Sequence, residues 1–155
     1  MAIDLNILKN ELLTDPLNLG YANFVETRND MSLHSLINEV TENQDIIISR
    51  GRISRDEFIE LTSQVVLNLM LESKNGNNDA KFWLDVFDRL VANSDTINVD
   101  DPSLDSIFTE MLNGNLIDQN SIDFVKIKFG SRAQKLFGST VTLDDVSNSL
   151  NEVEN

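Results

Sequence analysis

Cysteine is absent from this 155-residue sequence, and histidine occurs once. A chain without thiols forms no disulfide and no cysteine-ligated zinc site, which fits synthesis in a reducing, intracellular compartment. The single histidine, His34, stands among leucine and isoleucine residues, with no second histidine to share a metal. We interpret it as a partly buried or surface side chain rather than a ligand or a catalytic base.

Long apolar runs and a basic N-terminus are missing as well. The first ten residues, MAIDLNILKN, contain acidic and polar side chains where a secretory signal needs a basic start and an unbroken apolar stretch. No segment reaches the ~18 consecutive apolar residues of a membrane-spanning helix. We therefore expect a soluble protein that is made in the cytoplasm and has no membrane partner.

Basic residues are few relative to acidic ones. Twelve Lys and Arg stand against 26 Asp and Glu, which gives a net charge of −14. Proteins that bind free DNA or RNA draw much of their affinity from basic side chains that displace counterions, so we expect no free nucleic acid partner. Two interpretations of the acidity remain open: a solvated surface that maintains solubility, or an acidic face that docks on a basic partner or mimics DNA.

The sequence motifs of common enzymes are also absent. Neither phosphate-binding pattern, GxGxxG or GxxxxGK[ST], occurs, and there is no Gly-x-Ser-x-Gly nucleophile elbow. The acidic pairs Asp100-Asp101 and Asp144-Asp145 lack the spaced oxygen ligands and the glycine of a calcium loop, so we interpret them as helix caps. We expect neither enzymatic activity nor a cofactor, a metal or a small-molecule substrate.

What the sequence does contain is a series of helical patterns, in which apolar residues recur at spacings of three and four after polar capping residues. These patterns predict an all-α fold, a compact single domain of residues 1–155 with about six to eight short helices. Residues 1–30 are expected to form an N-terminal helix and a corner, residues 31–150 the helical body, and residues 151–155 a fraying tail. The predicted core consists of Phe58, Leu61, Val65, Leu69, Trp83, Phe87, Phe108 and Phe137.

The best-defined helix starts are three capping patterns and one polar pair. Ser54 precedes Glu57 by three residues, and Thr142 precedes Asp145 in the same way. Asp101 stands directly before Pro102, which is the cap-then-proline pattern. Asn78 or Asp79 is expected to cap the helix that contains Trp83 and Phe87. The helix that follows Ser54 carries a wide apolar face, which includes Ile59, Val66 and Met70, and is predicted to be the central buried helix.

Two segments allow more than one assignment. Residues 44–53 contain the run Ile46-Ile47-Ile48, which suits a short strand, a helix extension or a buried turn. Residues 121–129, SIDFVKIKF, alternate apolar and charged residues in their second half, as a strand does. Asn120 with Asp123 resembles a capping box, and apolar residues keep helical spacing, so we favour a helix for this segment.

The stretch LLTDPLNLGYAN, residues 12–23, interrupts a leucine-bearing helix. Pro16 removes a backbone donor and disfavours the helical conformation at Asp15, which can itself cap a new turn. Gly20 tolerates backbone angles that other residues avoid. We predict a structural corner that folds the first helix back onto the body, in which Pro16 sets the turn, Gly20 allows close backbone approach and Tyr21 is the buried anchor.

Seven of the twelve basic residues fall in two short islands. The islands contain Arg50, Arg52 and Arg55 in SRGRISR, and Lys126, Lys128, Arg132 and Lys135 in KIKFGSRAQK. One interpretation is a contact surface for an acidic protein partner, and convergence of the islands would make one positive patch. The other is local pairing with the protein's own carboxylates, such as Asp56, Glu57 or Asp123.

The stretch LKNELLTDPLNLGYAN resembles the signature of a small protein family encoded by many tailed bacteriophages, in which a leucine-bearing helix is followed by TDPxxxGYA. The C-terminal part is similar to that family too. Residues 131–138, SRAQKLFG, correspond to an SRAExLFG-like motif, with Gln134 in place of the glutamate of many relatives, and residues 141–146, VTLDDV, correspond to a Val-Thr-x-x-Asp-Val helix. Residues 25–100 match only as spaced helices.

The resemblance implies a phage protein and favours a virion-associated role, because relatives stand among structural genes. It implies no catalytic residue. The leading expectation is a non-enzymatic structural or accessory protein of a tailed-phage virion, at the neck, tail or capsid. Such a protein would be made in the host cytoplasm, enter the virion, and contact other virion proteins in multiple symmetric copies. The alternative is a phage-encoded cytoplasmic inhibitor of a host defence or nucleic-acid enzyme, acting through an acidic surface.

Overall fold

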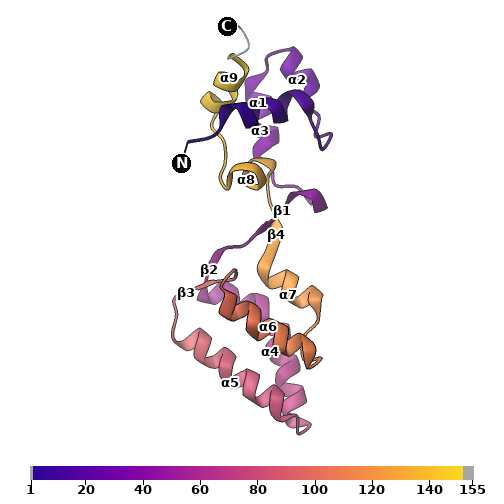
Figure 1. Cartoon of the computed structure of the whole chain (residues 1–155), viewed down its shortest axis with the longest axis vertical. Coiled ribbons are helices and arrows are strands. Elements are labelled where there is room, and N and C mark those ends of the chain that lie inside the picture. Colours follow the sequence, from indigo (N-terminus) through magenta and orange to yellow (C-terminus); the bar gives the residue numbers. More distant parts are fainter. Residues whose placement is uncertain (1, 152–155) are drawn as a thin grey trace. The chain divides into compact units, whose positions relative to one another are not determined.

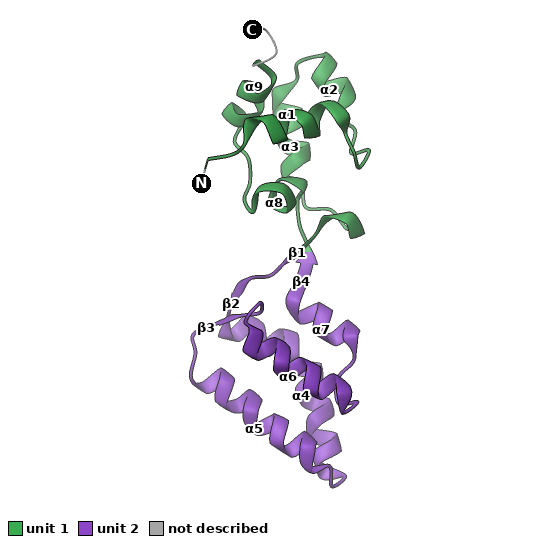
Figure 2. Ribbon diagram, viewed as in Figure 1, with its two compact units in different colours: residues 1–48, 129–155 green, residues 49–128 purple. Residues whose placement is uncertain are grey.

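The computed structural model describes residues 2–151, which form two compact units (Figures 1 and 2). Unit 1 comprises the described residues up to Ile48 together with those from Phe129 onward, and unit 2 comprises Ser49–Lys128. Unit 2 is therefore one continuous segment inserted between the two halves of unit 1. The sequence-based expectation of a single domain stays a prediction. The expected tail, apart from Asn151, lies outside the described residues.

Unit 1 is built from helices of both chain ends. Its elements are α1 (Leu5–Thr14), α2 (Ala22–Glu26), α3 (Asp30–Asn38), the 3-10 helix η1 (Gln44–Ile46), α8 (Arg132–Phe137) and α9 (Leu143–Asn151). Helices α1 and α3 both pack against α9, so the N- and C-terminal segments share one core. That core consists of Leu8, Leu12, Tyr21, Leu33, Ile37, Ala133, Val141, Val146 and Leu150.

Unit 2 has a core of its own. Its elements are β2 (Arg52–Ser54), α4 (Arg55–Lys74), α5 (Asn78–Ala92), β3 (Thr96–Asn98), α6 (Pro102–Asn113) and α7 (Gln119–Lys126). Strand β2 pairs antiparallel with β3, and the buried Ile53 lies opposite the buried Ile97. The rings of Phe58 and Phe87 stack with their centroids 6.0 Å apart between α4 and α5.

The sequence predicted an all-α fold, whereas the observed fold is mostly helical and also contains short strands. Residues 2–151 contain nine α-helices, rather than six to eight, and four short strands. Strands β1 (Ile47–Ser49) and β4 (Ile127–Phe129) form the second two-stranded sheet. Both ambiguous segments are mixed, since each contains a helical turn or helix and then a strand of mostly β-branched and aromatic residues.

The capping residues explain where several helices begin. The Ser54 hydroxyl accepts a hydrogen bond from the Glu57 amide, and the Asp101 carboxylate accepts one from Ser103. Thr142 and Asp145 bond each other's backbone amides reciprocally. Two helices begin at capping residues other than the predicted ones. Helix α5 is capped by Asn77, not by Asn78 or Asp79, and α7 by Asp118, whose carboxylate accepts from Ser121.

Most of the predicted core side chains are buried. Phe58, Val65, Leu69, Phe87 and Phe108 are buried in unit 2. Leu61 and Trp83 pack against that core while partly exposed, and Phe137 does the same at the core of unit 1. None of the helices in residues 2–151 contains an apolar stretch long enough to span a bilayer.

Candidate functional site: an apolar groove between α4 and α5

Helices α4 and α5 form a hairpin in unit 2 and lie side by side along their lengths (Figure 1). The short connection through Asn75 and Gly76 makes them antiparallel, and the Arg55 amide donates to the Asp95 carbonyl oxygen (2.9 Å) at the other end of the pair. A groove of about 650 Å³ runs between them. Its lining consists of Ile59, Thr62, Ser63, Val66, Leu67, Met70, Phe87, Asp88, Val91 and Ala92.

The groove is formed by large apolar side chains that remain open to solvent. Ile59, Leu67 and Met70 are 45%, 49% and 48% exposed, while Phe87 is buried beneath them. The prediction of a central buried helix is therefore confirmed for Phe58, Val65 and Leu69 but was wrong for Ile59 and Met70. Leu69 and Phe58 point into the core, and the widened part of the face, with Ile59 and Met70, contributes to the groove instead.

Few polar groups of the groove are free to bind a ligand. The hydroxyl of Thr62 donates to the Phe58 carbonyl oxygen (2.7 Å), and that of Ser63 donates to the Glu60 carbonyl oxygen (2.9 Å). Asp88 is the one charged residue in the lining, and its carboxylate is exposed. Within residues 2–151 this carboxylate has no hydrogen-bond or ion-pair partner. The groove thus combines an apolar floor with a single negative charge.

Exposed apolar surface of this kind is uncommon on a protein that works alone. Contiguous apolar patches rimmed by polar residues mark surfaces that bind proteins, membranes or ligands. The volume of the groove lies in the range of binding sites, and a helical hairpin provides a preformed wall on each side. Because its hydroxyl donors are already used, the groove can recognise a partner mainly by apolar packing and by the charge of Asp88.

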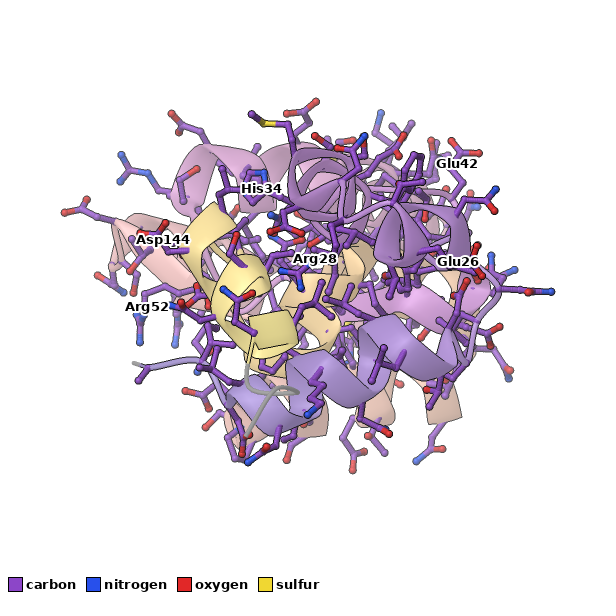
Figure 3. The ribbon with its side chains drawn as sticks, turned by 90° about the horizontal axis from the view of Figure 1, so that it is seen from above. Glu26, Arg28, His34, Glu42, Arg52 and Asp144 are labelled. Carbon is purple, nitrogen blue, oxygen red and sulfur yellow. The ribbon has the colours of Figure 1, made fainter. Side chains whose placement is uncertain are left out.

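The basic residues that the sequence singled out lie elsewhere, five of them in unit 2. Arg50 donates from Nε to the Phe124 carbonyl oxygen (3.1 Å), forms an ion pair with Glu57 (3.6 Å), and places its guanidinium 5.9 Å from the centre of the Phe124 ring. Arg52, labelled in Figure 3, is exposed and donates to the Thr96 hydroxyl (3.1 Å). Lys126 forms an ion pair with Asp105.

The other basic residues differ in whether their side chains have hydrogen-bond or ion-pair partners. In the described part of the chain, the side chains of Arg55 and Lys128 have no hydrogen-bond or ion-pair partner. In unit 1, Lys135 donates from Nζ to the Ile47 carbonyl oxygen (2.8 Å). Local contacts thus engage most of these cations within their own unit, and a role for them in partner contacts stays a prediction.

Of the seven basic residues, Arg132 forms the bidentate ion pair, with a largely buried carboxylate. Its Nε and Nη2 atoms donate to the two carboxylate oxygens of Glu11, at 2.7 and 2.9 Å. The Glu11 side chain is only 4% exposed and that of Arg132 14%. The hydrogen bonds to Glu11 raise the pKa of Arg132 above its already high ordinary value. This bidentate pair joins α1 to α8, and the sequence analysis did not identify Glu11 as its partner.

The corner at residues 12–23 is a structural feature of unit 1, held by the Asp15 side chain. Its carboxylate accepts hydrogen bonds from the amides of Leu19 (2.6 Å), Gly20 (2.8 Å) and Tyr21 (3.1 Å). Pro16 directly follows Asp15, which has a left-handed backbone conformation at the end of α1. The expectation of a close backbone approach at Gly20 was wrong, because no atom other than those of its chain neighbours lies within 4 Å of the position of an added Cβ. Its φ of +98° is what favours glycine.

Tyr21 is fully buried, as expected for an anchor. Its hydroxyl has no hydrogen-bond partner among the described residues. Burial, reinforced by the nearby Glu11 and Asp15 carboxylates, raises the pKa of the Tyr21 phenol well above its ordinary value.

The remaining candidates from the sequence have local roles. His34 on α3 is partly buried, and Asp101 and Asp145 cap helices. Arg28, which the sequence analysis did not single out, donates to the Asn151 side chain on α9 (2.8 Å). Arg28, His34 and Asp144 are labelled in Figure 3. No group of three or more histidine or acidic side chains within residues 2–151 is arranged to hold a metal ion.

Comparisons with models of protein families, with curated protein sequences and with solved structures give no match to this chain. The resemblance to the tailed-phage family therefore stays a prediction that depends on the two motifs in unit 1, at residues 8–23 and 131–146.

Proposed function

We propose that this chain is a non-enzymatic accessory or structural protein of a tailed-phage particle, and that it binds other particle proteins through the α4–α5 groove. The observation that carries the proposal is the exposure of Ile59, Leu67 and Met70 along one continuous groove. Burial of such side chains against a partner is favourable by roughly 25 cal/mol per Å² of apolar surface. The phage context comes from the motif resemblance alone.

The location of the two motifs supports a structural role for unit 1 and a binding role for the groove of unit 2. The residues of LLTDPLNLGYAN and SRAQKLFG contribute Leu12, Tyr21 and Ala133 to the core of unit 1, and Arg132 contributes to the ion pair with Glu11. These side chains are engaged in maintaining unit 1. In the groove of unit 2, by contrast, Ile59, Leu67 and Met70 are exposed and do not belong to the core, so they are available for contact with another protein.

Mass spectrometry of purified phage particles tests the proposal. We expect several copies of the chain per particle. A protein that is made in the host cytoplasm and built into a symmetric particle is present once for each symmetry-related position. Absence from particles, combined with abundance early in infection, would contradict the proposal. That result would favour the alternative, an inhibitor that acts on a host enzyme through the acidic surface.

A pair of variants links incorporation to the groove. Leu67→Lys places a charge in the groove, whereas Leu13→Lys places the same charge at an apolar residue of α1 that is 52% exposed. Both substitutions alter exposed side chains, so stability should change by less than about 0.5 kcal/mol. We expect Leu67→Lys to be depleted from particles and Leu13→Lys to be incorporated normally.

A further inference from the structure

We infer that the α4–α5 groove binds one amphipathic helix of a partner protein, whose apolar stripe enters the groove and whose Lys or Arg pairs with Asp88. The inference rests on the proposed function, since it specifies the chemistry of the partner for the same contact. The expected partner is a basic helix and not a second copy of this chain.

The dimensions of the groove suit a helix. The α4 residues that line it run from Ile59 to Met70, which is three helical turns or roughly 16 Å. They recur at spacings of three and four and so form one continuous face of α4. A partner helix with apolar residues at i, i+3 or i+4, and i+7 presents a stripe of about the same length. The groove therefore matches the recognition mode in which an amphipathic helix lies along an apolar groove.

The polar groups of the groove argue against recognition of an extended strand. Strand addition needs unpaired backbone donors and acceptors along an edge. Here both walls are helices, whose backbone groups are bonded within the helix, and the Thr62 and Ser63 hydroxyls donate to carbonyl oxygens of α4 itself. Packing of side chains against Leu67 and Met70 remains as the main source of affinity, and a helix delivers such side chains on one face.

Charge determines which helix is favoured. The carboxylate of Asp88 has no partner among residues 2–151, and docking an apolar helix without a cation would remove it from water uncompensated. Helices α4 and α5 contain seven acidic and four basic residues, and the whole chain has a net charge of −14. These charges attract a basic partner and repel a second copy, which would bring another −14 and a second Asp88.

Binding of designed peptides to the full-length protein tests the inference. The probe is a Leu/Lys peptide of about 14 residues with a helical apolar stripe, and the reference peptides are a scrambled Leu/Lys sequence and a Leu/Glu helix. Calorimetry measures affinity, and NMR of the Met70 and Ile59 methyl groups locates the site. We expect one Leu/Lys helix per chain, shifts at both methyl groups, and binding about tenfold or more weaker for either reference peptide.

Matched variants separate groove binding from general attraction to an acidic protein. Leu67→Lys should weaken binding of the Leu/Lys helix by about tenfold or more, because it puts a charge into the apolar contact. Asp88→Asn should weaken it by about two- to fivefold, the upper part of the range for one exposed ion pair. Leu13→Lys changes the net charge equally to Leu67→Lys but lies outside the groove, so it should leave affinity unchanged.

Several outcomes would overturn the inference. Equal binding of the scrambled peptide, or equal loss in Leu13→Lys, would show attraction by charge alone. Preference for the Leu/Glu helix would contradict the predicted positive charge of the partner. A dimer of the chain that Leu67→Lys disrupts would show that a second copy occupies the groove. If the Leu/Lys helix fails to bind while Leu67→Lys is depleted from particles, only the inference fails. Normal incorporation of Leu67→Lys would instead contradict the proposed function.

Discussion

At the scale of single residues, Arg132 and Glu11 link the two motif-bearing ends of the chain. The C-terminal motif supplies the guanidinium and the N-terminal motif the carboxylate, and both groups are largely removed from water. A buried pair of this kind contributes little compared with an apolar replacement, but the loss of one partner leaves the other charge unpaired. The pair therefore makes the two motifs depend on each other.

Arg132→Met should reduce the free energy of unfolding by about 3 kcal/mol or more, because the Glu11 carboxylate stays buried without a partner. The double variant Glu11→Leu/Arg132→Met should recover most of that loss. Urea unfolding followed by circular dichroism measures both. Arg52→Glu is the control, since Arg52 is exposed and should change stability by less than about 0.5 kcal/mol. Equal effects at Arg52 and Arg132 would contradict this account of the pair.

Tyr21 is the only tyrosine of the chain, so its ionisation can be followed directly by ultraviolet absorbance. Its pKa in the folded protein is raised, whereas the unfolded phenol ionises near pH ~10. The folded state then holds its proton more tightly, and stability that is fully present below about pH 10 declines as the pH rises further. We expect delayed tyrosinate absorbance in the native protein relative to the protein in urea.

Replacement of Tyr21 separates the ring from its hydroxyl. Tyr21→Ala should cost about 3 kcal/mol, because a fully buried ring is lost. Tyr21→Phe should cost far less, since the hydroxyl has no partner among the described residues, and it should flatten the decline of stability above pH ~10. Denaturant unfolding at neutral and alkaline pH measures both effects. A negligible loss in Tyr21→Ala would show that the ring does not anchor the corner.

At the scale of elements, the corner after α1 depends on one carboxylate that accepts three backbone amides. Asp15→Ala removes all three hydrogen bonds and should cost about 2 kcal/mol, because the amides of Leu19, Gly20 and Tyr21 lose their partner together. Asp15→Asn keeps one amide oxygen as an acceptor and should cost less. Thermal unfolding of the two variants measures the difference. Equal losses would contradict this account, because Asn, unlike Ala, keeps an acceptor oxygen and tolerates the left-handed backbone at this position.

The sequence predicted helices well where caps and spacing agreed. Ser54, Asp101 and Thr142 begin helices as expected, because a cap is a local contact between residues two or three positions apart. The short strands were less predictable. The pairing of β2 with β3 joins residues more than forty positions apart, and a single β-branched run such as Ile46-Ile47-Ile48 does not reveal its partner.

The candidate site was not predicted, although one signal for it was present. Apolar residues on α4 occupy more of the helix than one core-facing stripe needs, since Ile59, Leu67 and Met70 add to the stripe of Phe58, Val65 and Leu69. A sequence alone does not show whether a wide face is buried by the same chain. The structure distinguishes the two groups by their exposure, because α5 covers only part of α4.

At the scale of the whole molecule, unit 2 is inserted into unit 1 at residues that lie close together within each unit. In unit 1 the Gly130 amide donates to the Ile46 carbonyl oxygen (3.0 Å), and a Cβ at Gly130 would lie 2.7 Å from the Ile48 side chain. In unit 2 the Arg50 amide donates to the Lys126 carbonyl oxygen (2.8 Å). Adjacent ends are typical of an inserted segment with its own core.

Residues 49–128 should accordingly fold when produced alone. We expect a helical circular dichroism spectrum and cooperative thermal unfolding, because the segment contains a complete apolar core around Phe58, Phe87 and Phe108. The isolated segment should also bind the Leu/Lys helix with the affinity of the full chain. A non-cooperative transition would show that unit 2 needs unit 1 for its stability.

The most direct test of the central claim is photo-crosslinking within assembled phage particles. A photoreactive amino acid replaces Leu67 in the groove or, as the control, Leu13 on α1, and mass spectrometry identifies the linked segments. We predict that position 67 links to a segment of another particle protein with apolar residues every three or four positions and flanking Lys or Arg, and that position 13 does not. Adducts formed only from position 13, or equally from both, would contradict the assignment of the groove as the contact site.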